Sequence, residues 1–146
     1  MAPLTIAAAD VRTVRRADEH QHTAPAGEAI TAGQYIRFST TGKFELGNAS
    51  AAGEVGDGFI AEKSVAIGEA VTGLKGPCIL DVGDALSGIA YGVSVFLSDI
   101  DGTLADSAGT VSTVVGKVVP GWAGSAKKLL RLDQEFALAT PSGFMV

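Results

Sequence analysis

Apolar and polar residues alternate with a period of two along much of the chain after residue 27. In the run QYIRFS, residues 34–39, Ile36 and Phe38 fall on one face, and the run KFEL, residues 43–46, continues the alternation. A period of two is typical of strands with one buried face. Because Thr41-Gly42 lies between the two runs, the pattern predicts a β-hairpin.

Six further segments, separated mostly by Gly and Asp, have the same strand character. They are Gly58–Ala61, Ala70–Leu74, Cys78–Val82, Val93–Leu97, Val114–Val119 and Leu129–Leu132. Apart from a short turn at Gly124–Lys128, no segment has a helical pattern. The alternation predicts core positions at Ile36, Phe38, Phe44, Val95, Leu97, Leu104, Val118, Leu130 and Leu132, and it places Tyr35 and Arg37 on the opposite face.

A faint internal repeat relates two hairpins. The first copy begins at Gly27 with GEAITAGQYIRFSTTGKFEL, and the second begins at Gly83 with GDALSGIAYGVSVFLSDIDGTLAD. Matched pairs include Gly33 with Gly92, Ile36 with Val95, Phe38 with Leu97, Ser39 with Ser98, Gly42 with Gly102, Phe44 with Leu104 and Gly56 with Gly116. Hairpins with glycine turns resemble one another by chance, but the order of the matches favours two related units packed together.

The pattern therefore predicts an all-β fold, a small β-barrel or β-sandwich built from hairpins. Residues 1–26 and 133–146 show no clear period, so they are expected to form an extended N-terminal arm and a C-terminal tail around a β-domain of residues 27–132. Apolar residues in such termini suggest ordering on a partner. The expected partner-binding residues are Leu4, Ile6, Val11, Val14, Phe136 and Phe144, with Trp122, Arg15 and Arg16 as further candidates.

Composition narrows the class of partner. Apolar residues make up 47% of the 146 residues, charged residues 18%, and the formal net charge is −5. No basic face emerges, because Arg12, Arg15 and Arg16 are offset by neighbouring acids, so nucleic acid is not an expected partner. No apolar run is long enough to span a membrane and no signal peptide is apparent, so we expect synthesis in a cytoplasm. Cys78, the one cysteine, is expected to be buried.

The segment SDIDGTLADS, residues 98–107, resembles the first motif of the haloacid dehalogenase-like phosphatases. That resemblance implies Asp99 as nucleophile and Asp101 as acid/base beside Mg²⁺. The surroundings argue against it, because only residues 102–146 follow and they contain no amphipathic helix. Asp-Gly between two apolar runs is itself a turn signal. We therefore expect neither carboxylate to perform chemistry.

Other chemical motifs are weak. His20 and His22 form an HQH pair that lacks the additional Cys or carboxylate ligands of a metal site, so no metal or cofactor is expected. Both histidines lie in the expected N-terminal arm, which disfavours a Ser-His-Asp or Cys-His site. Trp122, between Gly121 and Ala123, is more typical of a packing plug or an interface anchor than of a ligand stack.

The order of these features resembles the capsid decoration (cement or head-stabilising) proteins of tailed bacteriophages. The matching segments are Gly27–Gly33, Gly42–Phe44, Asn48–Gly53, Val55–Ile60, Gly68–Val71, Gly83–Leu97, Val115–Val118 and Leu129–Leu132, while the arm and tail depart from the pattern. The resemblance implies an all-β, non-enzymatic virion protein that is made in the host cytoplasm and binds the major capsid protein on the outer capsid surface. It also implies a homo-oligomer, with a trimer favoured. A phage tail or fibre component and the phosphatase remain the alternatives.

Overall fold

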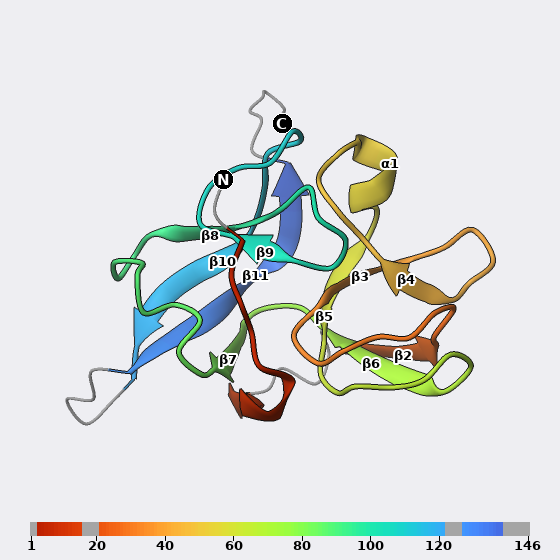
Figure 1. Cartoon of the computed structure of the whole chain (residues 1–146), viewed down its shortest axis with the longest axis horizontal. Coiled ribbons are helices and arrows are strands. Elements are labelled where there is room, and N and C mark those ends of the chain that lie inside the picture. The colour runs from red at the N-terminus through yellow and green to blue at the C-terminus, as the bar shows by residue number, and fades with distance from the viewer. Residues whose placement is uncertain (1–2, 16–20, 122–126, 139–146) are drawn as a thin grey trace.

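The computed structural model describes residues 3–15, 21–121 and 127–138 of the chain. Within these ranges the chain forms two antiparallel sheets, with one 3-10 helix (η1, Ala8–Asp10) and one short α-helix (α1, Ala52–Val55) (Figure 1). The predicted all-β class is confirmed. No helix of the described part has the length and apolarity needed to cross a membrane.

The smaller sheet has five strands in the order β2-β6-β5-β3-β4. Its strands are β2 (Gln21–Pro25), β3 (Tyr35–Phe38), β4 (Phe44–Leu46), β5 (Gly58–Ala61) and β6 (Ala70–Leu74). The hairpin predicted around Thr41-Gly42 joins β3 to β4, with Phe38 opposite Phe44. Gly42 has a φ of +83°, a conformation that disfavours residues with a Cβ, so this turn explains the glycine.

The larger sheet has six strands in the order β1-β7-β11-β10-β8-β9. Its strands are β1 (Val11–Arg15), β7 (Cys78–Val82), β8 (Ser94–Leu97), β9 (Leu104–Ala105), β10 (Thr113–Pro120) and β11 (Lys128–Leu138). All six strands predicted after the first hairpin are therefore present, three of them with the predicted bounds. The short turn expected at Gly124–Lys128 falls mostly outside the described residues, although Lys128 itself begins β11.

The two sheets share one topology. The order β2-β6-β5-β3-β4 becomes β7-β11-β10-β8-β9 when each strand is replaced by the strand five places later in the chain. The repeat seen in the sequence is therefore part of a duplicated five-stranded unit, and β1 is an addition to the second copy. Figure 1 shows the two units side by side along the long axis of the molecule.

The hairpins β3–β4 and β8–β9 confirm the matched positions. Leu97 lies opposite Leu104 as Phe38 lies opposite Phe44, and Gly102, like Gly42, has a positive φ. The match of Gly56 with Gly116 is wrong, because Gly56 ends α1 with a φ of +54° whereas Gly116 lies within β10. The repeat therefore weakens after the hairpins, where the first unit forms α1 and the second does not.

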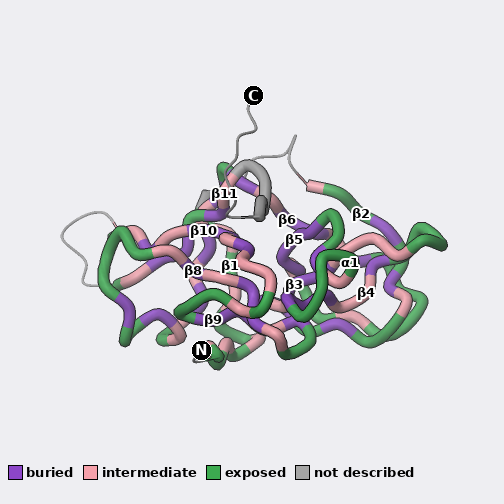
Figure 2. Tube along the Cα trace, turned by 90° about the horizontal axis from the view of Figure 1, so that it is seen from above, coloured by how far each residue is buried: buried purple, intermediate pink, exposed green. Residues whose placement is uncertain are grey.

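Two groups of buried side chains form the core. Buried positions lie mainly on the strands and exposed positions mainly on the loops between them (Figure 2). Eight of the nine side chains predicted to face inward are buried, and the ninth, Phe38, is half-buried against its neighbours. Tyr35, predicted to lie on the outer face, is instead fully buried together with Ile60 and Leu74. The smaller sheet thus has two covered faces, one over its own apolar cluster and one against the larger unit. Alternation within β3 could not distinguish these two environments.

The N-terminal segment is not a separate arm, contrary to the expectation. β1 pairs antiparallel with β7 in the larger sheet, and β2 pairs with β6 in the smaller one. The predicted boundary at residue 26 therefore cuts across both sheets. The boundary at residue 132 is wrong as well, because β11 continues to Leu138 and Leu138 pairs with Thr113. Residues 139–146 of the expected tail lie outside the described residues.

Candidate partner-binding surface

An N-terminal strap, defined here as residues 3–15, connects the two outer strands of the larger sheet. At one end the amide of Leu4 donates a hydrogen bond of 2.8 Å to the carbonyl oxygen of Leu104 in β9, and Pro3 bridges to Ala105. At the other end β1 pairs with β7, placing Val11 opposite Val82. The start of the strap therefore covers part of the edge of β9, and its end, β1, becomes the outer strand beside β7.

The apolar residues of the strap divide into two groups. Leu4 and Ile6 are half-buried and pack against the larger core cluster, so this chain's own interior accounts for their apolar character. Val11 is also half-buried, and a methyl group of its side chain lies close to Gly33. Val14, in contrast, is 39% exposed. Of these four predicted partner-binding residues, only Val14 presents a largely accessible apolar side chain.

The other predicted site residues cannot be placed as fully. Arg16, Trp122 and Phe144 lie outside the described residues. Arg15 belongs to β1 and Phe136 to β11 by their backbones, and their side chains are outside the description. Arg12 on β1 is exposed. Among the members of the set whose side chains the structure describes, Leu4 and Ile6 pack against the core and Val14 is exposed, so these three do not form one surface.

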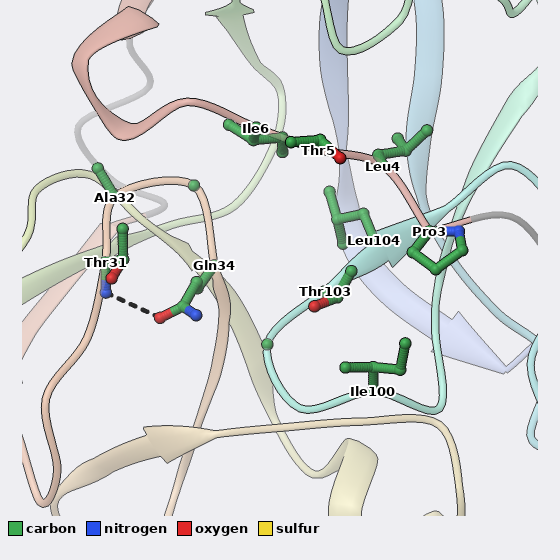
Figure 3. A pocket seen from close by; sticks show the side chains of 12 residues that line it. Pro3, Leu4, Thr5, Ile6, Thr31, Ala32, Gln34, Ile100, Thr103 and Leu104 are labelled. Atoms are coloured by element: carbon green, nitrogen blue, oxygen red, sulfur yellow. Dashed lines mark hydrogen bonds between the residues drawn. The ribbon is translucent and has the colours of Figure 1, made fainter.

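A shallow hollow of about 370 Å³ lies between the strap, the loop of residues 31–34 and the turn that joins β8 to β9 (Figure 3). Leu4 and Ile6 contribute to one wall and Ile100 to another. The side-chain oxygen of Gln34 accepts a hydrogen bond of 2.8 Å from the amide of Thr31, which holds the loop. This lining is mixed and carries no ionisable side chain, so it suits contact with another polypeptide better than binding of an ion.

A second hollow, of about 660 Å³, lies beside residues 8–13 of the strap. Its lining includes the charged residues Arg12, Glu62 and Lys63. The Thr13 hydroxyl donates a hydrogen bond of 3.3 Å to a carboxylate oxygen of Glu62, so this bond ties the strap to the smaller unit. Ala32 lines both hollows, which therefore follow the strap one after the other.

Apolar side chains project from turns near these hollows and elsewhere. Ile67, in the connection between β5 and β6, is 70% exposed, and Ile100, in the turn between β8 and β9, is 53% exposed. Tyr91 and Val93, which precede β8, are 46% and 41% exposed. Sequence reasoning missed all four, although an isoleucine within a polar turn such as DIDG is a signal that the side chain has no strand face to occupy.

The candidate catalytic pair holds loops together. Asp99 accepts two hydrogen bonds from Thr110, 2.8 Å from the amide and 2.7 Å from the hydroxyl. These bonds lower the pKa of Asp99, the amide contributing most. Asp101 accepts a hydrogen bond from the side-chain amide of buried Asn48. The turn has the expected hairpin form, with the amide of Ser98 donating to the carbonyl oxygen of Thr103.

The remaining chemical candidates have structural surroundings too. Cys78 is buried and has no disulfide. The His22 ring packs edge-on against Phe38 with the ring centroids 5.0 Å apart, and His20 lies outside the described residues. Among the described residues, no three His, Cys, Asp or Glu side chains gather as a metal site would require.

Comparison with known proteins gave no assignment. No protein-family model matches the chain. No curated protein matches it either.

Proposed function

We propose that the chain is a structural virion protein that binds the outer surface of an assembled phage head and stabilises the shell by bridging capsid subunits. One observation carries the proposal beyond the resemblance in sequence. Accessible apolar side chains, above all Ile67 and Ile100, project from turns, while the carboxylates of Asp99 and Asp101 are engaged in holding loops. Apolar side chains at the centre of a contact and polar groups at its rim are typical of protein-binding surfaces.

The physical role follows from linkage. A protein that binds the assembled shell but not the free capsid subunit stabilises the shell by an amount set by its occupancy and affinity. Many copies that each bridge neighbouring subunits gain further from multivalency. The chemistry needed is therefore a rigid β-scaffold with exposed contact residues. On this proposal the major capsid protein is the partner, the protein is made in the host cytoplasm, and nucleic acid, membranes and cofactors have no part.

Self-association belongs to the same proposal. A molecule with the symmetry of its binding position makes several equivalent contacts at once, and the resemblance favours three-fold positions. A reconstruction of decorated heads tests this feature directly. Trimers would support the three-fold form, dimers would replace it with another symmetry, and isolated monomers would contradict self-association.

The decisive experiment compares purified heads with and without the protein. Heads that lack it are mixed with the purified chain, pelleted, and assayed for bound protein and for the temperature at which they release DNA. The proposal predicts saturable binding to expanded heads, no binding to free capsid subunits, and a higher release temperature. Immunogold label on the tail or fibres instead of the head would support the alternative assignment and reject this one.

A further inference from the structure

The two middle strands of the larger sheet, β10 and β11, turn one face toward the core and the other away from it (Figure 1). Val118 and Leu130, on the inner face, are fully buried in the larger core cluster. Because successive side chains of a strand point to opposite faces, Lys117 and Arg131 belong to the outer face. Lys117 is half-buried and Arg131 is exposed. The outer face of the sheet therefore carries basic side chains at its centre.

The strand register brings these two side chains together. Arg131 of β11 lies directly opposite Lys117 of β10, and directly opposite residues have Cα atoms about 4.5–5.5 Å apart with their side chains on one face. On either side of the pair, Ser94 of β8 lies opposite Lys117 and Ile79 of β7 lies opposite Arg131. The backbone of Arg15 in β1 follows Ile79 in the same row. This row across five strands therefore contains basic residues and no acidic residue.

The pairing of Lys117 with Arg131 costs stability unless another charge offsets it, because like charges directly opposite on adjacent strands repel. Elsewhere on the outer face the charges are balanced. Asp81 lies opposite Arg12, and a carboxylate oxygen of Asp81 lies 3.4 Å from the Nζ atom of Lys127. Lys117 and Arg131, in contrast, form no ion pair among the described residues. The fold alone does not explain why two basic residues occupy these opposite positions.

Apolar side chains surround the basic pair on the same face. Phe96 of β8 lies opposite Val114 of β10, and both are half-buried, whereas Val95, the inward neighbour of Phe96, is fully buried. Val119 of β10 and Ile79 of β7 are half-buried as well. Partly accessible apolar side chains around a small number of charges are typical of a contact with another protein.

We propose that this outer face of the larger sheet, called the basic face below, binds an acidic patch on a folded protein, with Lys117 and Arg131 paired to its carboxylates. The inference rests on the proposed function, which makes that protein the major capsid protein. Carboxylates placed over the like-charged pair turn its repulsion into attraction. The described charged side chains of the basic face are Arg12, Lys117, Lys127 and Arg131, against Asp81 and Asp133. This excess of basic groups contrasts with the formal net charge of −5 of the whole chain.

Other partners fit the basic face less well. A second copy bound through the same face would bring two like-charged pairs together, and they would repel each other. A nucleic acid is a long polyanion that would extend beyond the basic face onto the rest of a chain with a net charge of −5. A compact acidic patch on a protein meets only the basic face, and it can also contact the apolar side chains around the basic pair.

Single neutral substitutions separate a binding role from a structural one. Lys117→Thr or Arg131→Thr removes the repulsion and introduces a residue that favours strands, so the melting temperature should stay the same or rise by about 1–3 °C. Each variant should nevertheless bind heads about three- to tenfold more weakly than the wild type. A fall in melting temperature of more than about 3 °C in both variants would show that the pair serves the fold, and it would overturn the proposal.

A charge-reversed double variant, Lys117→Glu with Arg131→Glu, tests the sign of the partner's charge. The matched control is Lys43→Glu with Lys63→Glu, which lowers the formal net charge from −5 by the same amount at exposed positions of the smaller unit. In co-sedimentation with heads, the first variant should lose at least about tenfold in affinity and the control less than about twofold. Wild-type binding should weaken between about 0.05 and 0.5 M NaCl. Equal losses in both double variants would show that only net charge matters, and they would overturn the proposal.

A measurement without heads separates failure of this inference from failure of the proposed function. Heads that bind the wild type and the charge-reversed variant equally would reject the basic face and leave the role at the phage head standing. If heads do not bind the wild type, that role is rejected, and immobilised poly-L-glutamate then tests the basic face alone. At low ionic strength the wild type should be retained and the charge-reversed variant should pass through. Passage of both proteins, or stronger retention of the wild type on immobilised duplex DNA, would overturn the proposal.

Discussion

Tyr35 provides a sensitive test of the packing between the two units. Its side chain is fully buried, and its hydroxyl donates a hydrogen bond of 2.9 Å to the carbonyl oxygen of Val55. The ring fits closely against Gly47 and Gly58, where an added Cβ would overlap the phenol. Tyr35→Phe removes one oxygen atom without opening a cavity of any size, so its effect isolates the hydroxyl.

At neutral pH the substitution should destabilise the protein by about 1.5 kcal/mol, because the carbonyl of Val55 loses a buried donor. An entropy of unfolding near 2.1 cal/mol/K per residue gives roughly 0.3 kcal/mol/K for a chain of this length, so the melting temperature should fall by about 5 °C. Calorimetry at pH 7 measures this directly. Tyr91→Phe is the matched control, since Tyr91 is 46% exposed, and its change should stay within about 0.5 kcal/mol.

The same residue predicts a specific alkaline behaviour. Burial raises the pKa of Tyr35 well above its ordinary value of 10.0, Asp57 adds to the increase, and Arg37 opposes it. Above pH 10 the unfolded state loses this proton while the folded state keeps it. The stabilisation is therefore complete below pH 10 and declines as the pH rises, by up to about 1.4 kcal/mol per pH unit. Tyr35→Phe lacks this decline, so the two stability curves should cross near about pH 11.

Urea unfolding of both proteins from about pH 8 to 11.5 provides the test. Other groups that titrate in this range are common to both proteins and cancel in the difference. A stability difference that stays constant across the range would refute the reasoning, because it would mean that Tyr35 ionises equally in the folded and unfolded states. A neutral-pH difference below about 0.5 kcal/mol would refute the importance of the hydrogen bond.

Three further predictions concern the strap, the carboxylates and the exposed turns. Deleting residues 1–15 should lower the melting temperature by about 10 °C or more, since it removes an edge strand and the half-buried side chains of Leu4, Ile6 and Val11; an unchanged melt would show that the strap is dispensable. With Mg²⁺ and p-nitrophenyl phosphate the protein should release no phosphate above background, and a phosphatase activity that Asp99→Asn abolishes would contradict this prediction. The double variant Asp99→Asn, Asp101→Asn should bind heads nearly as well as the wild type. Ile67→Ser and Ile100→Ser should weaken binding to heads while changing stability by less than about 0.5 kcal/mol, and full head occupancy by both variants would exclude these turns from the contact.

The strands of the central region could be predicted because their signals are local. Period-two alternation and glycine turns located β3 to β8, and the repeat related the β3–β4 and β8–β9 hairpins. The inward position of Tyr35 could not be predicted in the same way. Alternation identifies two faces of a strand, but it does not reveal that both faces are covered when a second unit packs against the sheet.

The strands of the N-terminal segment were missed for a different reason. The sequence QHTAP of β2 has little strand propensity, and the sequence VRTVR of β1 is short and charged. Both are strands because of the partners that lie far away in the chain, β6 and β7. Such pairing is a tertiary effect that no local pattern records. The packing of Leu4 and Ile6 against the core also involves distant segments, so the sequence pattern led to a partner-binding role for them instead.

Apolar residues near a terminus can bind a partner or cover a sheet edge of their own chain, and the sequence alone does not distinguish the two roles. In this chain Leu4 and Ile6 pack on their own core, and the strap that carries them covers β9 and β7. The apolar side chains of Leu4 and Ile6 are therefore used for packing within this chain and not for contact with a partner. The two units cover their outer strands in different ways, because the strap adds β1 beside β7, whereas Ala26, directly after β2, bridges to Phe44 of β4.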